Sequence, residues 1–223
     1  MKKEYVKVSL IMNIIIFALV LLASIIMFTG YKFMEGPEIL LESSKLGMFR
    51  FFTVDSNIFM GVISFIFIIK DIEFLKGKIK DIDKRYYILK LMSTVAVAIT
   101  FFVVFTYLGP ISKGGIMSML LNSNLFFHLV IPVLSMLTFT LFEGTSKLEL
   151  KYIYYGVVPT VLYSIYYLIN VLVHIENGKV SPIYDWYWFV QGGLWNAFIV
   201  APLMIVISCF ISLILWRLNR VDK

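Results

Sequence analysis

The chain has almost no cysteine and very little histidine. Cys209 is its single cysteine, and His128 and His174 are its only histidines among 223 residues. A lone cysteine excludes an intramolecular disulfide, and this set lacks the ligand spacing of a zinc site. The sequence also lacks a phosphate-binding glycine loop and any nucleic-acid motif. We therefore expect no metal, no cofactor and no nucleic-acid partner.

Charged residues are also scarce, at 15% of the chain, whereas hydrophobic residues make up 60%. Soluble domains usually have about 25% charged residues, and a helix of about 20 apolar residues crosses a bilayer. Five long runs carry no charge, and a sixth, 51–69, carries only Asp55. The sequence predicts an all-α, polytopic membrane protein that forms one domain over 1–223. Its six transmembrane helices are expected at about 8–30, 51–73, 88–109, 123–143, 152–174 and 193–216.

The positions of the basic residues predict the orientation of these helices. With the N-terminus inside, most of the 20 lysines and arginines fall on the cytoplasmic side, many of them in the segment 76–90. Cytoplasmic loops of membrane proteins carry such an excess, so both termini are expected in the cytoplasm. The segment 76–90 is expected to orient the protein and contact anionic lipid. The expected location is a cell membrane, and specifically a bacterial plasma membrane.

Polar residues interrupt the hydrophobic pattern mainly near the outer side. Such residues are costly at membrane depth and often mark a site. The predicted inner halves hold few of them, mainly Asn13, Ser64, Ser93 and Thr94. The sequence therefore predicts a pocket that opens toward the outer leaflet. Its candidate residues are Thr53, Asp55, Ser56, Asn57, Asn124, His128, His174, Trp188 and Asn196.

Helical spacing relates these candidates to one another. Thr53, Ser56 and Asn57 share one helix face, whereas Asp55 lies about 200° around the helix from Thr53. A threonine hydroxyl becomes a nucleophile when a base such as His128 takes its proton. Asn57 or Asn124 would orient the ring or donate to an oxyanion. The alternative is structural, because such side chains also form hydrogen bonds between membrane helices.

Two motifs carry a resemblance to known proteins. They are Phe51-Phe-Thr-Val-Asp-Ser-Asn57 and His128-Leu-Val-Ile-Pro132. Together they resemble bacterial six-span membrane proteins that are distantly similar to the androgen-induced-gene/ADTRP family. That family comprises multi-span threonine hydrolases that cleave fatty acid esters of hydroxy fatty acids. The resemblance implies that Thr53 is the nucleophile and His128 the catalytic histidine. Asp55 departs from the expected pattern, where an apolar or variable residue would stand.

Three functional hypotheses follow. The leading one is an intramembrane lipid-ester hydrolase that acts on a fatty acyl ester or another membrane lipid through Thr53 and His128. The second is a small-molecule or proton-coupled transporter that uses Asp55, although transport requires polar groups near both faces. The third is a lipid-binding membrane protein without catalysis, in which Thr53 and His128 lie far apart.

Overall fold

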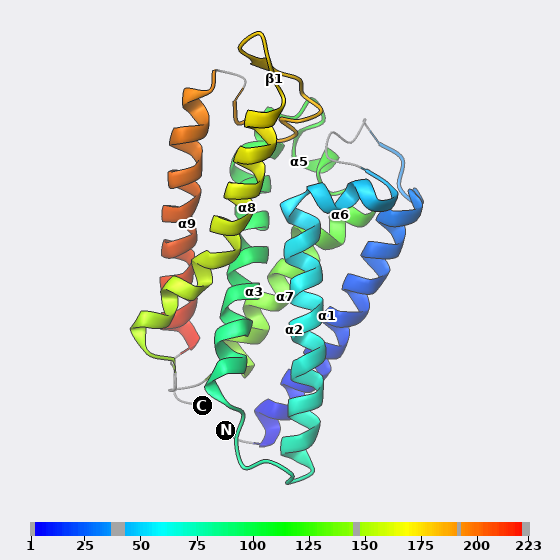
Figure 1. Ribbon diagram of the computed structural model, residues 1–223. Coiled ribbons are helices and arrows are strands. Elements are labelled where there is room, and N and C mark those ends of the chain that lie inside the picture. Colours follow the sequence, from blue (N-terminus) through cyan, green and yellow to red (C-terminus); the bar gives the residue numbers. More distant parts are fainter. Residues whose placement is uncertain (1–2, 37–42, 145–147, 191–192, 220–223) are drawn as a thin grey trace.

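The computed structural model describes residues 3–36, 43–144, 148–190 and 193–219. The protein is mostly helical, and its long helices run up and down along a common direction (Figure 1). The start of α1 and the end of α9 lie at one end of the bundle, here called the termini end. The opposite end is called the hairpin end. The long α-helices are α1 (Lys3–Thr29), α2 (Phe52–Leu75), α3 (Lys84–Val103), α8 (Ile153–Val173) and α9 (Trp195–Asn219).

Two helical segments contain wide π-helical turns. α3 continues through the π turn η2 (Val104–Leu108) into α4 (Gly109–Ile111). The next consists of α6 (Ser123–Leu125), the π turn η3 (Phe126–Val130), α7 (Ile131–Leu137) and a second π turn, η4 (Thr138–Phe142). Pro110 and Pro132 each follow a π turn and occupy the first residues of the next α-helix, where a missing N–H costs little. His128 lies inside η3, and π turns of this kind are frequent at functional sites.

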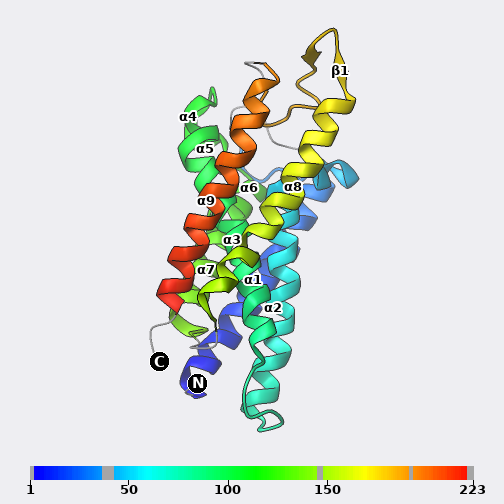
Figure 2. The ribbon, with the colours of Figure 1, turned by 60° about the vertical axis from the view of Figure 1, so that its left-hand side comes forward.

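Short elements connect the long helices. The 3-10 turn η1 (Lys45–Arg50) precedes α2, and the 3-10 turn η5 (Leu150–Tyr152) precedes α8. One-turn helix α5 (Gly115–Ser118) lies at the hairpin end (Figure 2). Strands β1 (Ile175–Glu176) and β2 (Lys179–Val180) pair antiparallel, with Ile175 opposite Val180. This hairpin protrudes beyond the helices and gives that end its name.

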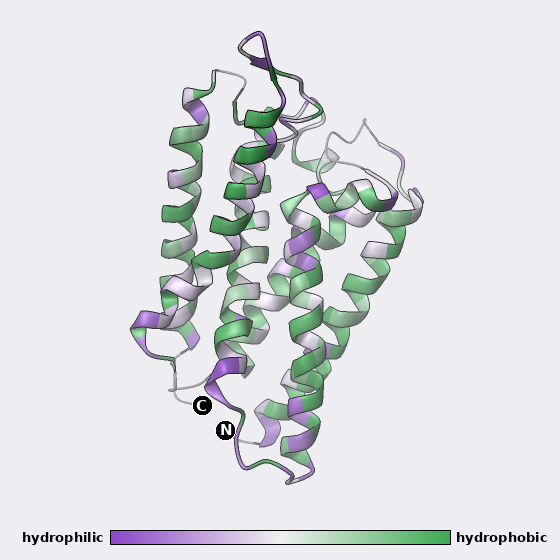
Figure 3. Cartoon of the chain, in the orientation of Figure 1, coloured by the Kyte–Doolittle hydropathy of each residue, from purple (hydrophilic) through white to green (hydrophobic). Residues whose placement is uncertain are grey.

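The helices have the length and composition of a multi-pass membrane protein. Figure 3 shows hydrophobic residues along the middle of the long helices and hydrophilic residues toward both ends. α2 has 24 residues and packs against α1 and α3, although it is not among the segments that qualify by length and hydropathy. Within the described ranges, five segments are long and apolar enough to cross a membrane: Lys3–Thr29, Lys84–Ile111, Ser123–Phe142, Leu150–Val173 and Trp195–Asn219.

Small residues allow two pairs of helices to pack closely. A Cβ atom at Gly61 of α2 would lie 2.8 Å from Val20 of α1. At Gly156 of α8 it would lie 2.3 Å from the Ser212 hydroxyl oxygen of α9. Membrane helices associate mainly through such close contacts and through hydrogen bonds, since lipid provides no hydrophobic drive between them. These glycines therefore fix the α1–α2 and α8–α9 pairs.

The expectation of an apolar termini end is wrong. Asp71, Lys90 and Glu143 are all fully buried there, beside Ser9 and Asn13. The sequence interpretation placed Lys90 in the lipid-facing segment 76–90, but α3 begins at Lys84 and carries Lys90 into the bundle. Asp71 lies within α2, as it does in the expected helix 51–73. These charges were not among the candidate residues, yet they lie buried between helices.

Candidate functional site

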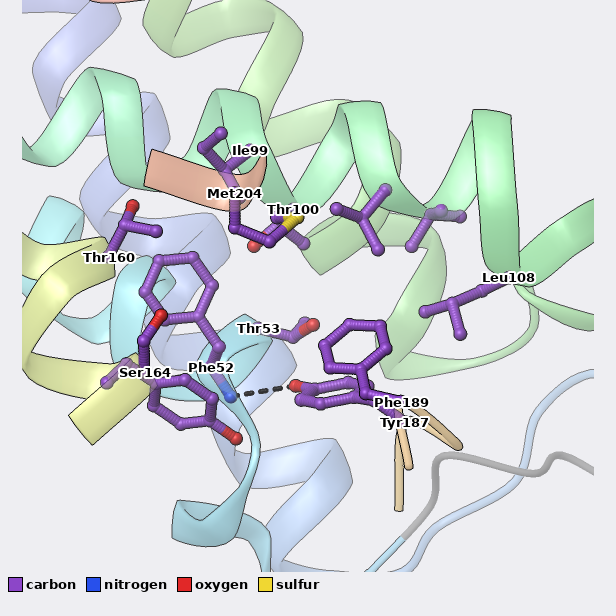
Figure 4. A pocket seen from close by; sticks show the side chains of 13 residues that line it. Phe52, Thr53, Ile99, Thr100, Leu108, Thr160, Ser164, Tyr187, Phe189 and Met204 are labelled. Carbon is purple, nitrogen blue, oxygen red and sulfur yellow. Dashed lines mark hydrogen bonds between the residues drawn. The ribbon is translucent and has the colours of Figure 1, made fainter. Parts of the chain in front are cut away.

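Thr53 lies in the first turn of α2 and lines a cavity. Phe51 is extended and Phe52 begins the helix, so Thr53 is held at its very start. Its side chain is 7% exposed and points into the cavity (Figure 4). The cavity volume is about 60 Å³, enough for a few waters or a short stretch of acyl chain. The lining is Phe52, Thr53, Ile99, Thr100, Val103, Val104, Leu108, Thr160, Tyr163, Ser164, Tyr187, Phe189 and Met204.

Two tyrosines tie the loop before α9 to the start of α2. The Phe52 N–H donates to the Tyr187 hydroxyl at 2.9 Å, which is the dashed line in Figure 4. The Tyr163 hydroxyl donates to the Arg50 carbonyl at 2.6 Å and accepts from the Trp186 indole N–H at 3.0 Å. Burial raises the pKa of Tyr187 to about 12, against the opposing effect of hydrogen bonds with Tyr163, Phe52 and Thr53. Tyr187 is therefore a neutral hydrogen-bond donor beside Thr53.

A larger groove lies next to this cavity. It runs between α2 and α8, has a volume of about 520 Å³, and is lined mostly by apolar side chains. Phe52 and Tyr163 line both the groove and the cavity, so they form the wall between the two. Asp55 lines the groove whereas Thr53 lines the cavity, as their spacing on the helix predicts. A third cavity of about 40 Å³, between α8 and α9, also includes Tyr163.

His128 lies in η3 and does not line the Thr53 cavity. Its side chain is 1% exposed, and its Nδ1 lies 2.6 Å from the Met119 carbonyl oxygen. A carbonyl can only accept, so Nδ1 carries the proton and Nε2 is left as the basic nitrogen. Among the hydrogen bonds of the described residues, none joins His128 to Thr53.

The Asn57 side chain links α2 to the turn that carries His128. Its Nδ2 donates to the Thr53 carbonyl at 2.7 Å and to the Phe127 carbonyl at 3.1 Å. Because one nitrogen reaches both oxygens, these carbonyl oxygens lie within about 6 Å of each other. The backbone next to Thr53 and the backbone next to His128 therefore approach closely.

The other polar candidates of α2 and α6 differ in the contacts that they make. The Ser56 hydroxyl lies 3.1 Å from both the Thr53 carbonyl oxygen and the Thr100 hydroxyl oxygen. This joins α2 to α3 beside the cavity. Asn124 is buried, and its Oδ1 has no hydrogen-bond partner. Asp55 and Arg50 form no ion pair among the described residues.

Three further candidates lie outside the cavity lining. His174 ends α8, where its Nδ1 lies 2.8 Å from the Asn170 carbonyl oxygen and its ring stacks on Tyr184 at 3.6 Å. Trp188 has the left-handed backbone φ of 56°, which is uncommon for a bulky residue. Asn196 lies in the first turn of α9. The structure thus gathers Thr53, Ser56 and Asn57 around one region. His174, Trp188 and Asn196 do not line the cavity, although Trp188 stands between the lining residues Tyr187 and Phe189.

Sequence reasoning missed several residues of the cavity. Tyr163 and Tyr187 were not among the candidate residues, yet both line the cavity. Thr160 and Ser164 are four residues apart on α8 and line it as well. That spacing of hydroxyl groups within an apolar run was the available signal.

Comparisons with known proteins give no relative for this arrangement. No protein-family model matches the chain, and no curated protein or solved structure is significantly similar to it. Within the described part of the chain, no group of three His, Cys, Asp or Glu side chains is placed to hold a metal ion.

Proposed function

We propose that this chain is a six-span membrane protein that hydrolyses a lipid ester in the cavity lined by Thr53. The five apolar segments support the membrane setting. α2, with 24 residues packed between α1 and α3, would be the sixth span. The excess of basic residues toward the termini end favours both termini in the cytoplasm, in a bacterial plasma membrane. The Thr53 cavity then opens toward the outer leaflet.

The observation that carries the proposal is a threonine hydroxyl group in an apolar cavity beside a lipid-sized groove. The groove between α2 and α8 has room for an acyl chain, whereas the cavity has room only for the part of the substrate that reacts. Phe52 and Tyr163 separate the two spaces. A fatty acyl ester would lie in the groove and present its carbonyl carbon to Thr53 past these rings.

The reaction would be acyl transfer through threonine. Thr53 Oγ1 attacks the ester carbonyl carbon as its proton passes to Nε2 of His128, directly or through one water. The alcohol leaves with that proton, and water then hydrolyses the acyl-threonine. The Tyr187 hydroxyl, beside Thr53, would donate to the oxyanion. The close approach of the backbone at Thr53 and Phe127 supports this role for His128, and so does the resemblance of both motifs to threonine hydrolases.

The test uses a fluorophosphonate probe together with turnover on a panel of acyl esters. Purified protein is expected to be labelled and to hydrolyse at least one ester. Thr53→Ala is expected to abolish both activities, and His128→Ala to reduce both by at least about 100-fold, the usual range for a general base. Thr106→Ala and His174→Ala are matched controls, because Thr106 is exposed and His174 stacks on Tyr184. Labelling that persists in Thr53→Ala would contradict the proposal.

A second candidate function is lipid binding without catalysis, which is favoured by the absence of His128 from the cavity lining. It predicts lipid that copurifies in the groove and is lost when Leu162 or Phe59 is replaced by tryptophan, with no turnover in the unaltered protein. Groove-filling substitutions should abolish turnover as well if the hydrolase proposal is right. The carrier hypothesis differs from both, because it requires flux into proteoliposomes that Asp55→Asn abolishes.

A further inference from the structure

Lys90 is buried at the termini end without access to water, and it is surrounded by oxygen atoms. Its Nζ lies 2.5 Å from Asn13 Oδ1, 3.2 Å from Glu143 Oε1 and 3.4 Å from the Ser64 hydroxyl oxygen. The Phe67 ring centroid lies 5.0 Å from the same nitrogen. These partners come from α1, α2 and the residue that follows η4. The ammonium group is therefore the centre at which four parts of the chain meet.

Two buried carboxyl groups share this space. The Ser9 hydroxyl donates to Asp71 Oδ2 at 2.8 Å and lies 3.3 Å from Glu143 Oε1. Because one hydroxyl oxygen reaches both carboxyls, these two carboxyl oxygens lie within about 6 Å of each other. The Asn13 amide donates to Glu143 Oε1 at 2.8 Å. Asp71 Oδ1 and Glu143 Oε2 are buried and have no hydrogen-bond partner.

The charges of this cluster do not balance. With every group ionised, Asp71, Glu143 and Lys90 carry a net charge of −1 in a region that water does not reach. An unpaired buried charge is strongly disfavoured, and two nearby carboxylates are disfavoured further. Tyr87 of α3 is close enough to both carboxyls to interact with them electrostatically, and it adds no positive charge. From α9, Asn219 reaches the backbone carbonyl of Glu143 through its neutral amide. Among the residues that the structure describes, the helices around the cluster thus supply no second cation.

A bound proton is the ligand that fits the available space. A metal ion would need a cavity of its own and would be repelled by the ammonium group, which lies 3.2 Å from Glu143. The cavities and grooves described above are lined by other residues. A proton neutralises the extra charge and gives one of the unpartnered carboxyl oxygens a donor hydrogen without occupying volume.

We propose that Asp71 and Glu143 hold one shared proton beside Lys90, and that this cluster is a proton-binding site at the termini end. Binding converts one carboxylate to a carboxylic acid and leaves a neutral set of one acid, one carboxylate and one ammonium. Release of the proton leaves a buried negative charge between α1, α2, α3 and the end of η4. The packing of these elements therefore depends on proton concentration at the termini end.

The test is infrared spectroscopy of full-length protein in lipid nanodiscs at neutral pH. It measures the intensity of the C=O band of protonated carboxyl groups. The unaltered protein is expected to show this band with a shift in D₂O. Asp71→Asn and Glu143→Gln are each expected to lose the intensity of one carboxylic acid, because the remaining carboxylate pairs with Lys90. Lys90→Met is expected to gain the intensity of one, because both carboxyls must then be protonated. Glu176→Gln, an exposed acid, is the control.

Two results would overturn the proposal. One is a band intensity that is equal in the unaltered protein, Asp71→Asn and Glu143→Gln. The other applies if those variants do not fold: protein that carries Asp55→Asn and Asp185→Asn but an intact cluster, labelled with carbon-13 first at aspartate and then at glutamate carboxyls, shows no shifted band for either label. Asp55 and Asp185 contribute equally to every variant spectrum and cancel in the differences. The lipid-ester hydrolase proposal does not depend on this outcome, because its cavity lies at the other end of the bundle.

Discussion

Replacing Lys90 by methionine tests how far the buried cluster stabilises the fold. Methionine keeps the length of the side chain and its contact with Phe67 but removes the ammonium group. The variant then lacks the nitrogen that lies 3.2 Å from Glu143 Oε1 and donates to Asn13 Oδ1 at 2.5 Å. Removing one member of a buried ion pair costs about 3–5 kcal/mol, because the opposite group must then either stay charged without compensation or take up a proton. We expect a loss of that size at neutral pH.

The sign of the pH dependence follows from proton binding. In the folded variant both carboxyls must stay protonated, whereas in the unfolded chain they ionise above about pH 4. The folded state therefore binds more protons, and the destabilisation shrinks as the pH falls toward that value. The assay is equilibrium unfolding in mixed micelles, followed by circular dichroism.

Two comparisons make the Lys90 result interpretable. Lys80→Met removes an exposed charge in the neighbouring loop and should change the free energy of unfolding by less than about 0.5 kcal/mol. The double variant Lys90→Met/Glu143→Gln removes both charges of the pair and should be more stable than Lys90→Met alone. If Lys90→Met is no more destabilising than Lys80→Met, the reasoning about the buried cluster is refuted.

Three further substitutions probe other contacts by the same assay. Gly156→Ala should cost about 1–3 kcal/mol by overpacking, since its Cβ would lie 2.3 Å from the Ser212 hydroxyl oxygen, and adding Ser212→Ala should recover part of that loss. Asn219→Ala removes donors to the Phe139 and Glu143 carbonyls at 2.6 and 2.9 Å, and a loss of about 1–2 kcal/mol is expected; no change would show that the end of α9 is not held by them. Burial raises the pKa of Asp185, and the Tyr167 hydroxyl opposes this by donating to its carboxylate, so Tyr167→Phe should destabilise more at neutral than at acidic pH. Equal losses at both pH values would contradict the Tyr167 argument.

The sequence predicted the helices well because their signal is local. Uncharged runs of sufficient length define each long helix, and the structure has a helical segment at every expected position. The boundaries shifted where helices extend past the apolar runs, as at Lys84 and Leu75. Hydropathy marks where a chain is apolar, but a helix continues for as long as its backbone hydrogen bonds and packing allow.

The polar contacts were harder to predict because they depend on which helices meet. The shared face of Thr53, Ser56 and Asn57 follows from spacing on one helix, and the structure confirms that Ser56 and Asn57 both bond to the Thr53 carbonyl. The Lys90 cluster joins residues that are far apart in the sequence. Asn13 and Glu143, for example, are 130 positions apart. No local pattern marks such a contact, so these charges were not recognised as a cluster.

The direct test of the account is to find which residue becomes acylated. Purified protein in nanodiscs would be reacted with a fluorophosphonate, digested, and mapped by mass spectrometry. We predict a single adduct on the peptide containing Thr53, at its hydroxyl oxygen, with no adduct in Thr53→Ala and a much slower adduct in His128→Ala. An adduct on another hydroxyl group, such as Ser164 in the same cavity, would contradict the assignment of Thr53 as the nucleophile.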